Sequence, residues 1–251
     1  MRLGAILGHL SSELQPTPIA ERAKRFVGEG FDSLWAFHAV GRGFMVPDPF
    51  VTLAVAATAT EQVELGTAIV QVPLYHPVDL AHRVLSLMQE CGERLTLGVG
   101  AGSTEADFVT FERDYAGRFR AFNQNLARLR VLLRDGRDEQ AELDPGKTTT
   151  AGPRLVLGSW GAGVERAARE FDGWMASAYR RTADQIIEAL ERYRAAGGQR
   201  AMVSTIQVAG YDDLGPTGDL LQRYAEAGFD DAVVLLRPGG PDPKAVRALL
   251  P

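Results

Sequence analysis

The sequence is poor in cysteine and has no apolar run of transmembrane length. Its single cysteine, Cys91, has no partner for an internal disulfide, which is typical of proteins from a reducing compartment. No apolar run approaches the about 20 residues that a membrane-spanning helix needs. The first 14 residues carry one basic side chain and too short an apolar run for a secretory signal. These absences predict a cytoplasmic protein without a membrane-embedded segment.

Several functional signatures are also missing. Lys and Arg total 27 against 32 Asp and Glu, and both signs are mixed along the chain, so there is no basic footprint for nucleic acid. Metal-ligand spacings such as His-x-His, His-x-x-x-His or paired cysteines do not occur. The segment GSWG at 158–161 lacks the Gly-x-Ser-x-Gly elbow of a serine hydrolase. The sequence thus predicts neither a metal site nor a nucleic-acid partner.

The stretch from Val63 to Ser103 shows the organisation of the chain. Val63–Val70 is an apolar run typical of a strand, and Pro77 opens a segment with apolar residues at helical spacing. Cys91-Gly92 ends that helix, and Arg94–Gly100 reads as a second strand that runs into glycines. Two buried strands joined by a helix predict a right-handed βαβ unit, with ligands at the carboxyl ends of the strands.

The same alternation continues along the whole chain. It predicts eight strands and eight helices in 251 residues, which is close to the about 250 residues of a (β/α)8 TIM barrel. A doubly wound sheet would need a glycine-rich fingerprint after the first strand, where this chain has GHLSSEL. We therefore expect residues 1–251 to form one compact α/β barrel domain. The predicted strands are 2–8, 33–37, 63–70, 94–100, 154–158, 173–177, 201–209 and 231–236.

One joint recurs three times. The segments EGFDSLWAF (29–37), REFDGWMAS (169–177) and EAGFDDAVV (226–234) each end a predicted helix, place Phe-Asp in the turn and begin a strand. Repeated helix–strand joints are what repeated βα units produce. Two segments stand outside the alternation: we expect a polar, partly aromatic stretch at 104–118 and a surface loop at 135–152.

Chemistry in such a barrel belongs at the carboxyl ends of its strands. His9 and His38 fall at the ends of the first two predicted strands, and His38 directly follows the buried run SLWAF. Histidine is the side chain best suited to move protons near neutral pH. Two glycine-rich turns, GVGAGS (98–103) and GSWGAG (158–163), also follow strands. Their small residues and free backbone N–H groups indicate a phosphate-bearing cofactor.

With these features assembled, the chain resembles the bacterial luciferase-like family of flavin- and deazaflavin-dependent oxidoreductases. The resemblance covers nearly the whole chain and is strongest in four segments: 30–38, 48–81, 93–102 and 155–177. It implies a (β/α)8 barrel that holds FMN or coenzyme F-420 at the carboxyl ends of its strands. It also implies either monooxygenation or hydride transfer on a small organic substrate.

The resemblance assigns roles by position. His38 matches the family's active-site histidine, and Ala68-Ile69 falls where the family often has a non-prolyl cis peptide behind the flavin ring. The cofactor's ribityl and phosphate portions would lie beside the two glycine-rich loops, at Gly100, Ala101, Gly102, Gly158, Ser159, Trp160 and Gly161. Aromatic residues and a histidine would line the substrate pocket, namely His9, Phe37, Phe44 and Tyr179.

Four positions depart from the family pattern. Ala101 stands where FMN enzymes can carry a phosphate-binding arginine, and Ser103 replaces the glutamate of sugar-phosphate dehydrogenases. Phe37 and Met88 each replace a common aspartate. The missing arginine favours coenzyme F-420 slightly over FMN, because arginines near the strand ends could bind its acidic tail: Arg42, Arg180, Arg181 and Arg237.

Three hypotheses follow. The first is an oxidoreductase in which His38 handles a proton at the reacting centre. The second is a non-catalytic flavin- or deazaflavin-binding protein or partner subunit on the same barrel. The third is a cofactor-free barrel such as a sugar isomerase, which the lack of clustered carboxylates and lysines at the strand ends disfavours. The apolar helix expected at 49–60 predicts a homodimer if it is not covered within the barrel's own helix layer.

Overall fold

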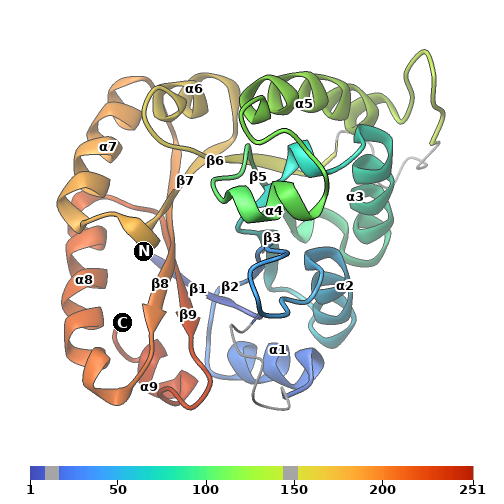
Figure 1. Cartoon of the computed structure of the whole chain (residues 1–251). Helices are drawn as coiled ribbons and strands as arrows, with labels where there is room; N and C mark the ends of the chain where they lie inside the picture. Colours follow the sequence, from blue (N-terminus) through green and yellow to red (C-terminus); the bar gives the residue numbers. More distant parts are fainter. Residues whose placement is uncertain (9–16, 144–151, 251) are drawn as a thin grey trace.

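A computed structural model describes residues 1–8, 17–143 and 152–250, and its centre is a closed barrel of parallel strands (Figure 1). The sheet order is β3-β2-β1-β9-β8-β7-β6-β5-β4, and β3 also pairs with β5, which closes the circle. Because β3 and β4 share one place, the barrel has eight strand positions, and the predicted (β/α)8 fold is confirmed. The strands are β1 Arg2–Ile6, β2 Ser33–Ala36, β3 Glu64–Thr67, β4 Val70–Gln71, β5 Leu95–Gly100, β6 Arg154–Gly158, β7 Gly173–Ser177, β8 Arg200–Val208 and β9 Asp231–Leu236.

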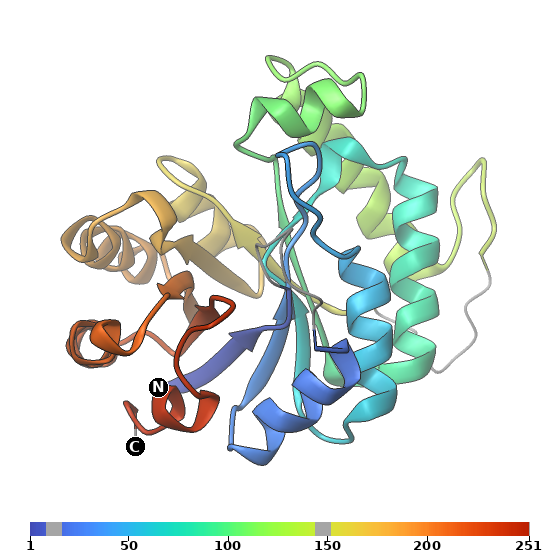
Figure 2. The same cartoon turned by 60° about the horizontal axis from the view of Figure 1, so that its bottom comes forward.

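Helices surround this barrel on the outside (Figure 2). They are α1 Ile19–Gly28, α2 Pro49–Ala59, α3 Pro77–Cys91, α4 Glu105–Thr110, α5 Arg118–Asp135, α6 Gly163–Glu170, α7 Ala183–Ala195, α8 Leu214–Ala227 and α9 Pro243–Arg247. Local sequence explains several of their starts. The Asp48 carboxylate accepts hydrogen bonds from the backbone N–H groups of Phe50 and Val51, and Thr182 and Gln185 form a capping box.

The predicted strand at 63–70 is wrong in one respect. It divides into β3 and β4, and the peptide bond between Ala68 and Ile69 at the division is cis. The apolar run itself carries no clear sign of this break, because Thr67 and Ile69 favour a strand and Ala68 disfavours one only weakly.

The stretch at 104–118 also differs from expectation, since it contains the short helix α4. Six residues are too few to show a helical period, and its buried aspartate runs against the usual pattern. The helix lies at the carboxyl end of β5, in front of the barrel in Figure 1. It therefore belongs to the end of the barrel where the site is expected.

The three Phe-Asp joints share one geometry. Asp32 donates its backbone N–H to the carbonyl of Leu3, and its carboxylate accepts the backbone N–H of Leu3 at 2.8 Å. Asp172 makes the same pair of bonds to Leu155, and Asp230 to Ala201. Each joint thus ties the start of one strand to the start of its neighbour, which explains the recurrence seen in the sequence.

Two apolar layers hold the barrel. The outer layer packs between the sheet and the helices, and the inner one fills the barrel with Ile6, Trp35, Val156, Met175, Met202, Val233 and Leu235. Trp35 is fully buried, and a Cβ atom on Gly66 would overlap its ring. The inner layer is therefore a packed core, and access for a ligand remains only at the two ends.

Charged side chains close the amino end of the barrel. Glu64, only 7% exposed, accepts hydrogen bonds from Thr96 at 2.6 Å and from Arg200 at 2.8 and 3.0 Å. Arg200 also binds Asp231, and Arg2 contacts both carboxylates. With this end closed by satisfied charges, the carboxyl end is where a site can lie. We call that opening the barrel mouth.

Candidate active site

The floor of the barrel mouth is built from four of the predicted cofactor-binding residues. Ala68 and Ile69 are half-buried and pack on the inner core layer. A Cβ atom on Gly100 would lie 2.8 Å from Cδ1 of Ile69, and one on Gly158 would lie 2.7 Å from its Cγ2. Glycine at these two strand ends thus makes room for the Ile69 side chain. Ala68, Ile69, Gly100 and Gly158 form what we call the apolar floor.

The loop after β5 lies beside this floor and packs closely against Gln71. Gly102 has a φ of +83°, and a Cβ atom there would overlap Oε1 of Gln71. Ala101 and Gly102 are half-buried, and the Tyr115 hydroxyl donates a hydrogen bond to the Ser103 carbonyl at 3.1 Å. The loop is therefore packed closely against its surroundings and still reaches the surface of the mouth.

The loop after β6 is held mainly by its own hydrogen bonds. The Ser159 hydroxyl donates to the carbonyl of Gly163 at 2.8 Å, and the Trp174 indole donates to the carbonyl of Ser159 at 3.2 Å. The guanidinium of Arg181 lies 4.1 Å from the centre of the Trp160 ring, which joins this loop to the segment after β7. Because the Ser159 proton is already used, an anion here would be bound by backbone N–H groups.

His38 lies at the end of β2, although its side chain is only 8% exposed. Its ring packs against Tyr75 and Phe111, with centroid distances of 5.2 and 6.2 Å. The neighbouring Phe37 packs instead against the inner core layer, as Ala68 and Ile69 also do. The structure therefore brings Phe37 to the apolar floor and places the His38 ring in an aromatic cluster next to it.

The His38 imidazole is held in the neutral form. Burial lowers the pKa of His38 below its ordinary value, and the attraction of Asp48 and Asp107 only partly opposes this. The Nδ1 atom is buried and has no hydrogen-bond partner among the described residues. A neutral imidazole with a free nitrogen is chemically able to accept or donate one proton.

A buried ion pair beside His38 was not expected from the sequence. Asp107, on α4, is 0% exposed and accepts hydrogen bonds from Arg42 at 2.7 Å and from the Gln71 amide at 2.6 Å. The same Gln71 amide donates to the carbonyl of His38 at 3.1 Å. Burial would raise the pKa of Asp107, but its bonds to Arg42 and Gln71 hold it below the ordinary value. Asp107 thus fixes α4, the segment after β2 and the end of β4 together.

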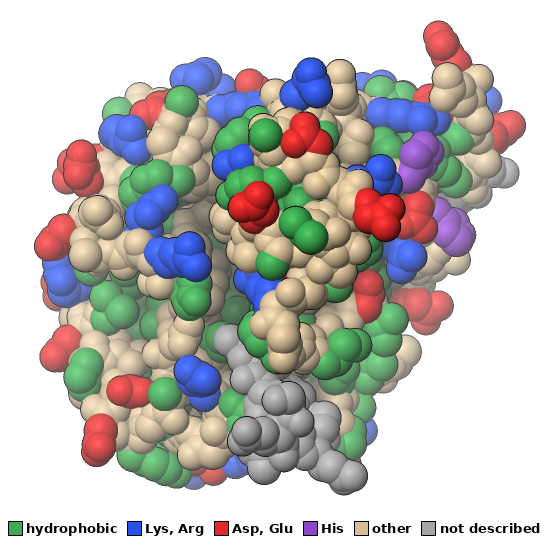
Figure 3. Space-filling view, in the orientation of Figure 1, with side chains coloured by type: hydrophobic (Ala, Val, Ile, Leu, Met, Phe, Trp, Pro, Cys, Tyr) green, Lys and Arg blue, Asp and Glu red, His purple; other side chains and the backbone are tan. Residues whose placement is uncertain are grey.

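The remaining predicted pocket residues have mixed positions. Phe37 and Phe44 are half-buried, whereas Tyr179, in the short helix η4 Ala178–Arg180, is 57% exposed. His9 lies outside the described residues. Figure 3 shows the face that holds the mouth, with a groove between the side of α7 and α8 and the side of α4.

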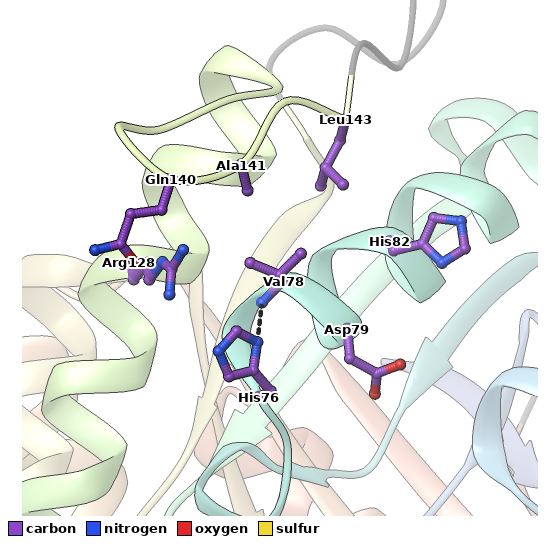
Figure 4. A pocket seen from close by; sticks show the side chains of 8 residues that line it. All are labelled: His76, Val78, Asp79, His82, Arg128, Gln140, Ala141 and Leu143. Carbon is purple, nitrogen blue, oxygen red and sulfur yellow. Dashed lines mark hydrogen bonds between the residues drawn. The ribbon is translucent and has the colours of Figure 1, made fainter.

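Two other hollows lie away from the mouth. One, of about 550 Å³, opens between α3 and α5 and is lined by His76, Val78, Asp79, His82, Arg128, Gln140, Ala141 and Leu143 (Figure 4). His76 is used there as the cap of α3, since its Nδ1 accepts the backbone N–H of Val78 at 3.3 Å. The other, of about 390 Å³, lies at the closed amino end, among Arg2, Glu64 and Arg154.

The described ranges 1–8, 17–143 and 152–250 contain neither a metal-binding cluster nor a membrane-spanning helix. No cluster of three or more His, Cys, Asp or Glu side chains there could hold a metal ion. No helix in those ranges is long and apolar enough to cross a membrane.

The fold and this site define a (β/α)8 barrel with an apolar floor at the carboxyl ends of its strands. The family model described as luciferase-like monooxygenase matches residues 3–211, and the chain belongs to that family. The resemblance drawn from the sequence is therefore confirmed.

A curated relative and three solved structures are similar to the chain. The 4-hydroxyprotoasukamycin monooxygenase of Streptomyces nodosus subsp. asukaensis is 36% identical over 106 residues, which are 41% of this chain and 28% of that protein. The chain thus spans less than a third of that relative's length. The monooxygenase RslO1 of Streptomyces bottropensis superposes with a TM-score of 0.80 at 19% identity, covering 99% of this chain and 96% of that one.

The other two structures differ in cofactor. The oxygenating constituent of 3,6-diketocamphane monooxygenase of Pseudomonas putida, in complex with FMN, gives a TM-score of 0.68 at 19% identity, over 92% of this chain and 80% of that one. The coenzyme F420-dependent tetrahydromethanopterin reductase of Methanopyrus kandleri gives 0.71 at 16% identity, over 99% and 96%. At these identities the likeness shows the fold alone.

Proposed function

We propose that the chain is a luciferase-like oxidoreductase that holds FMN or coenzyme F-420 in the barrel mouth, with the cofactor ring on the apolar floor. The observation that carries this proposal is the floor itself. Ile69 is half-buried on the inner core, and Gly100 at the end of β5 and Gly158 at the end of β6 leave room for its side chain. A flat, uncharged surface at the ends of parallel strands suits a planar ring.

The phosphate portion of either cofactor would lie beside the loops after β5 and β6. Gly102, Ala101 and Gly161 are half-buried at the surface, which permits close approach of a ligand to backbone N–H groups. When bound, the cofactor supplies a ring that exchanges a hydride with the substrate or, as reduced FMN, reacts with oxygen. The protein's own part is to hold that ring and to move one proton.

We propose that the His38 side chain accepts or donates this proton. It is neutral because burial lowers its pKa, and its Nδ1 atom has no partner in the described structure. Arg42, Asp107 and Gln71 form a hydrogen-bond network, and Gln71 in this network also binds the backbone carbonyl of His38. The network therefore fixes the position of the His38 backbone. The chain then binds a small organic substrate above the cofactor.

Between the two cofactors we favour coenzyme F-420, and two observations support this choice. Ala101 supplies no cation to a compact phosphate, while Arg180 and Arg237 are exposed at the mouth and suit a longer acidic tail. Arg42 no longer counts among these cations, because Asp107 neutralises it. Relatives of both cofactor types share the fold.

One observation favours a second candidate function. The His38 ring is almost completely buried beside Tyr75 and Phe111, which suits a protein that binds the cofactor without catalysis. Such a protein would store the cofactor or serve as a partner subunit. It would bind the cofactor tightly and would tolerate the loss of the imidazole.

Titration of the purified protein with FMN and with coenzyme F-420, followed by absorbance and fluorescence, tests the proposal. Micromolar or tighter binding of one cofactor is the expected result. Binding of one and not the other also selects between oxygen chemistry and hydride transfer. If neither cofactor binds, the proposed function is wrong and a cofactor-free barrel replaces it.

A further inference from the structure

The exposed apolar side chains of this molecule are concentrated at one end. Within the described residues, eight large hydrophobic side chains are exposed, and seven of them follow the carboxyl ends of strands. One of the seven is Val51, in the first turn of α2, and the other six are Met45, Val109, Phe111, Phe119, Tyr179 and Tyr211. Their exposed fractions run from 40% to 76%. Scattered surface hydrophobics are normal, whereas a gathering around one opening indicates a binding surface. We call these six residues the apolar rim.

The apolar rim lies on both sides of the barrel mouth. Met45 follows β2, and Val109, Phe111 and Phe119 follow β5, whereas Tyr179 and Tyr211 follow β7 and β8. In the closed strand order, β2 and β7 are on opposite sides of the circle. Figure 3 shows hydrophobic side chains on both sides of the groove that crosses this face.

From this arrangement we propose that the mouth takes a substrate with a bulky apolar body, which lies in the groove between the two sides of the apolar rim. The inference rests on the proposed function, and it names the class of substrate. A flat protein partner would bridge the rim and leave the groove unfilled. A molecule within the groove contacts both sides at once and buries more apolar surface per atom.

The surface between the apolar rim and the inner core is also apolar. Phe37, Ala68 and Ile69 continue the surface to the inner core. Two of the cations beside it are already engaged, because Arg42 pairs with Asp107 and Arg181 stacks on Trp160, and in the proposed function Arg180 and Arg237 bind the acidic tail of the cofactor. A small, strongly polar substrate such as a sugar would find few free partners here, whereas rings or branched hydrocarbon would displace water from the whole path.

Nile red, a neutral polycyclic dye, tests this inference on the full-length protein, with and without bound cofactor. We expect one equivalent to bind with micromolar affinity and enhanced fluorescence. Val109→Ser and Tyr179→Ser, from opposite sides, should each weaken binding at least fivefold. Val27→Ser is the matched control, since this exposed valine lies near the end of α1, at the amino end of the barrel, and it should change nothing.

Three outcomes would overturn the inference. The dye could fail to bind at micromolar concentration, or the Val27→Ser control could weaken dye binding as much as the rim variants do. Sedimentation could instead show a dimer that Val109→Ser converts to a monomer, which would mean that a second copy of the chain covers the rim. Cofactor titration of the same samples keeps the two proposals apart, because cofactor binding without dye binding contradicts only this inference.

Discussion

The side chain of Ile69 fills the space that a Cβ atom on Gly158 would need. Such an atom would lie 2.7 Å from Cγ2 of Ile69, closer than two carbon atoms can approach. Gly158 ends β6, and Ile69 begins the segment that continues as β4, so the contact reaches over the end of β5, which lies between these two strands. A glycine that the sequence assigned to phosphate binding therefore also shapes the apolar floor.

Gly158→Ala should destabilise the protein by about 1–3 kcal/mol, because the new methyl group must displace Ile69. Chemical denaturation measures this loss. Gly210→Ala is the matched control, since that glycine also follows a strand and has no atom within 4 Å of an added Cβ. In the double variant Gly158→Ala/Ile69→Ala the methyl group has room, so the loss should be smaller than the sum of the single losses. Strict additivity would show that the two residues do not compete for space.

Asp107→Asn removes the charge that holds Arg42 and leaves this half-buried cation without its ion-pair partner. We expect a loss of about 3 kcal/mol in the free energy of unfolding. Glu105→Gln, an exposed change on the same helix, should be silent. Cofactor affinity of Asp107→Asn should fall as well, because α4 and the end of β4 are no longer fixed. A folded Asp107→Asn protein of wild-type stability would contradict the claim that this carboxylate holds α4, the segment after β2 and the end of β4 together.

Glu64 should make stability dependent on pH in the acid range. Burial alone would raise the pKa of Glu64, but Arg200, Thr96 and Arg2 lower it from 4.5 to about 2. A carboxylate whose pKa is lower in the folded state stabilises that state above its unfolded pKa, and this stability disappears as the pH falls from about 4.5 towards 2. The full contribution is about 3 kcal/mol, of which about 2 kcal/mol is lost by about pH 3.

Unfolding free energies measured from neutral pH to about pH 3 check this expectation. Glu64→Gln should have the shallower pH profile, and Glu93→Gln, an exposed change at the same end of the barrel, should keep the wild-type profile. If Glu64→Gln does not fold, Thr96→Val removes one of the hydrogen bonds that lower the pKa and should flatten the profile in part. Identical profiles in all variants would refute the assignment.

His38→Ala tests the proton-handling role directly. If the imidazole is a general acid or base, turnover of the bound cofactor should fall by roughly 10²–10⁴-fold. His82→Ala, on the exposed face of α3, is the control. Turnover of His38→Ala within a factor of a few of wild type, with cofactor affinity retained, would favour the non-catalytic alternative.

Much of the fold could be predicted because it depends on local patterns. The alternation of strand-like and helix-like hydrophobic patterns predicted the barrel. The Phe-Asp joints at Asp32, Asp172 and Asp230 make the same pair of hydrogen bonds in the structure. The division of the strand at Ala68-Ile69 cannot be predicted from residue type, since Ile69 favours a strand and Ala68 disfavours one only weakly.

The site was less predictable because it depends on distant partners. Asp107 is stabilised by Arg42 and Gln71, which are 65 and 36 residues away, so a lone acid in a polar stretch gave no local signal. His38 and Phe37 are adjacent in sequence, yet only the folded chain shows that Phe37 joins the inner core while His38 packs against Tyr75.

The central claim is that the barrel mouth binds a phosphate-bearing flavin or deazaflavin, and a comparison of two glutamate variants tests it most directly. Ala101 is half-buried beside the apolar floor, whereas Ala195 is exposed at the end of α7, away from the mouth. Absorbance titrations with FMN and with coenzyme F-420 should show affinity at least tenfold weaker for Ala101→Glu, because like charges repel, and unchanged affinity for Ala195→Glu. Equal affinities in wild type and both variants would mean that the cofactor binds elsewhere.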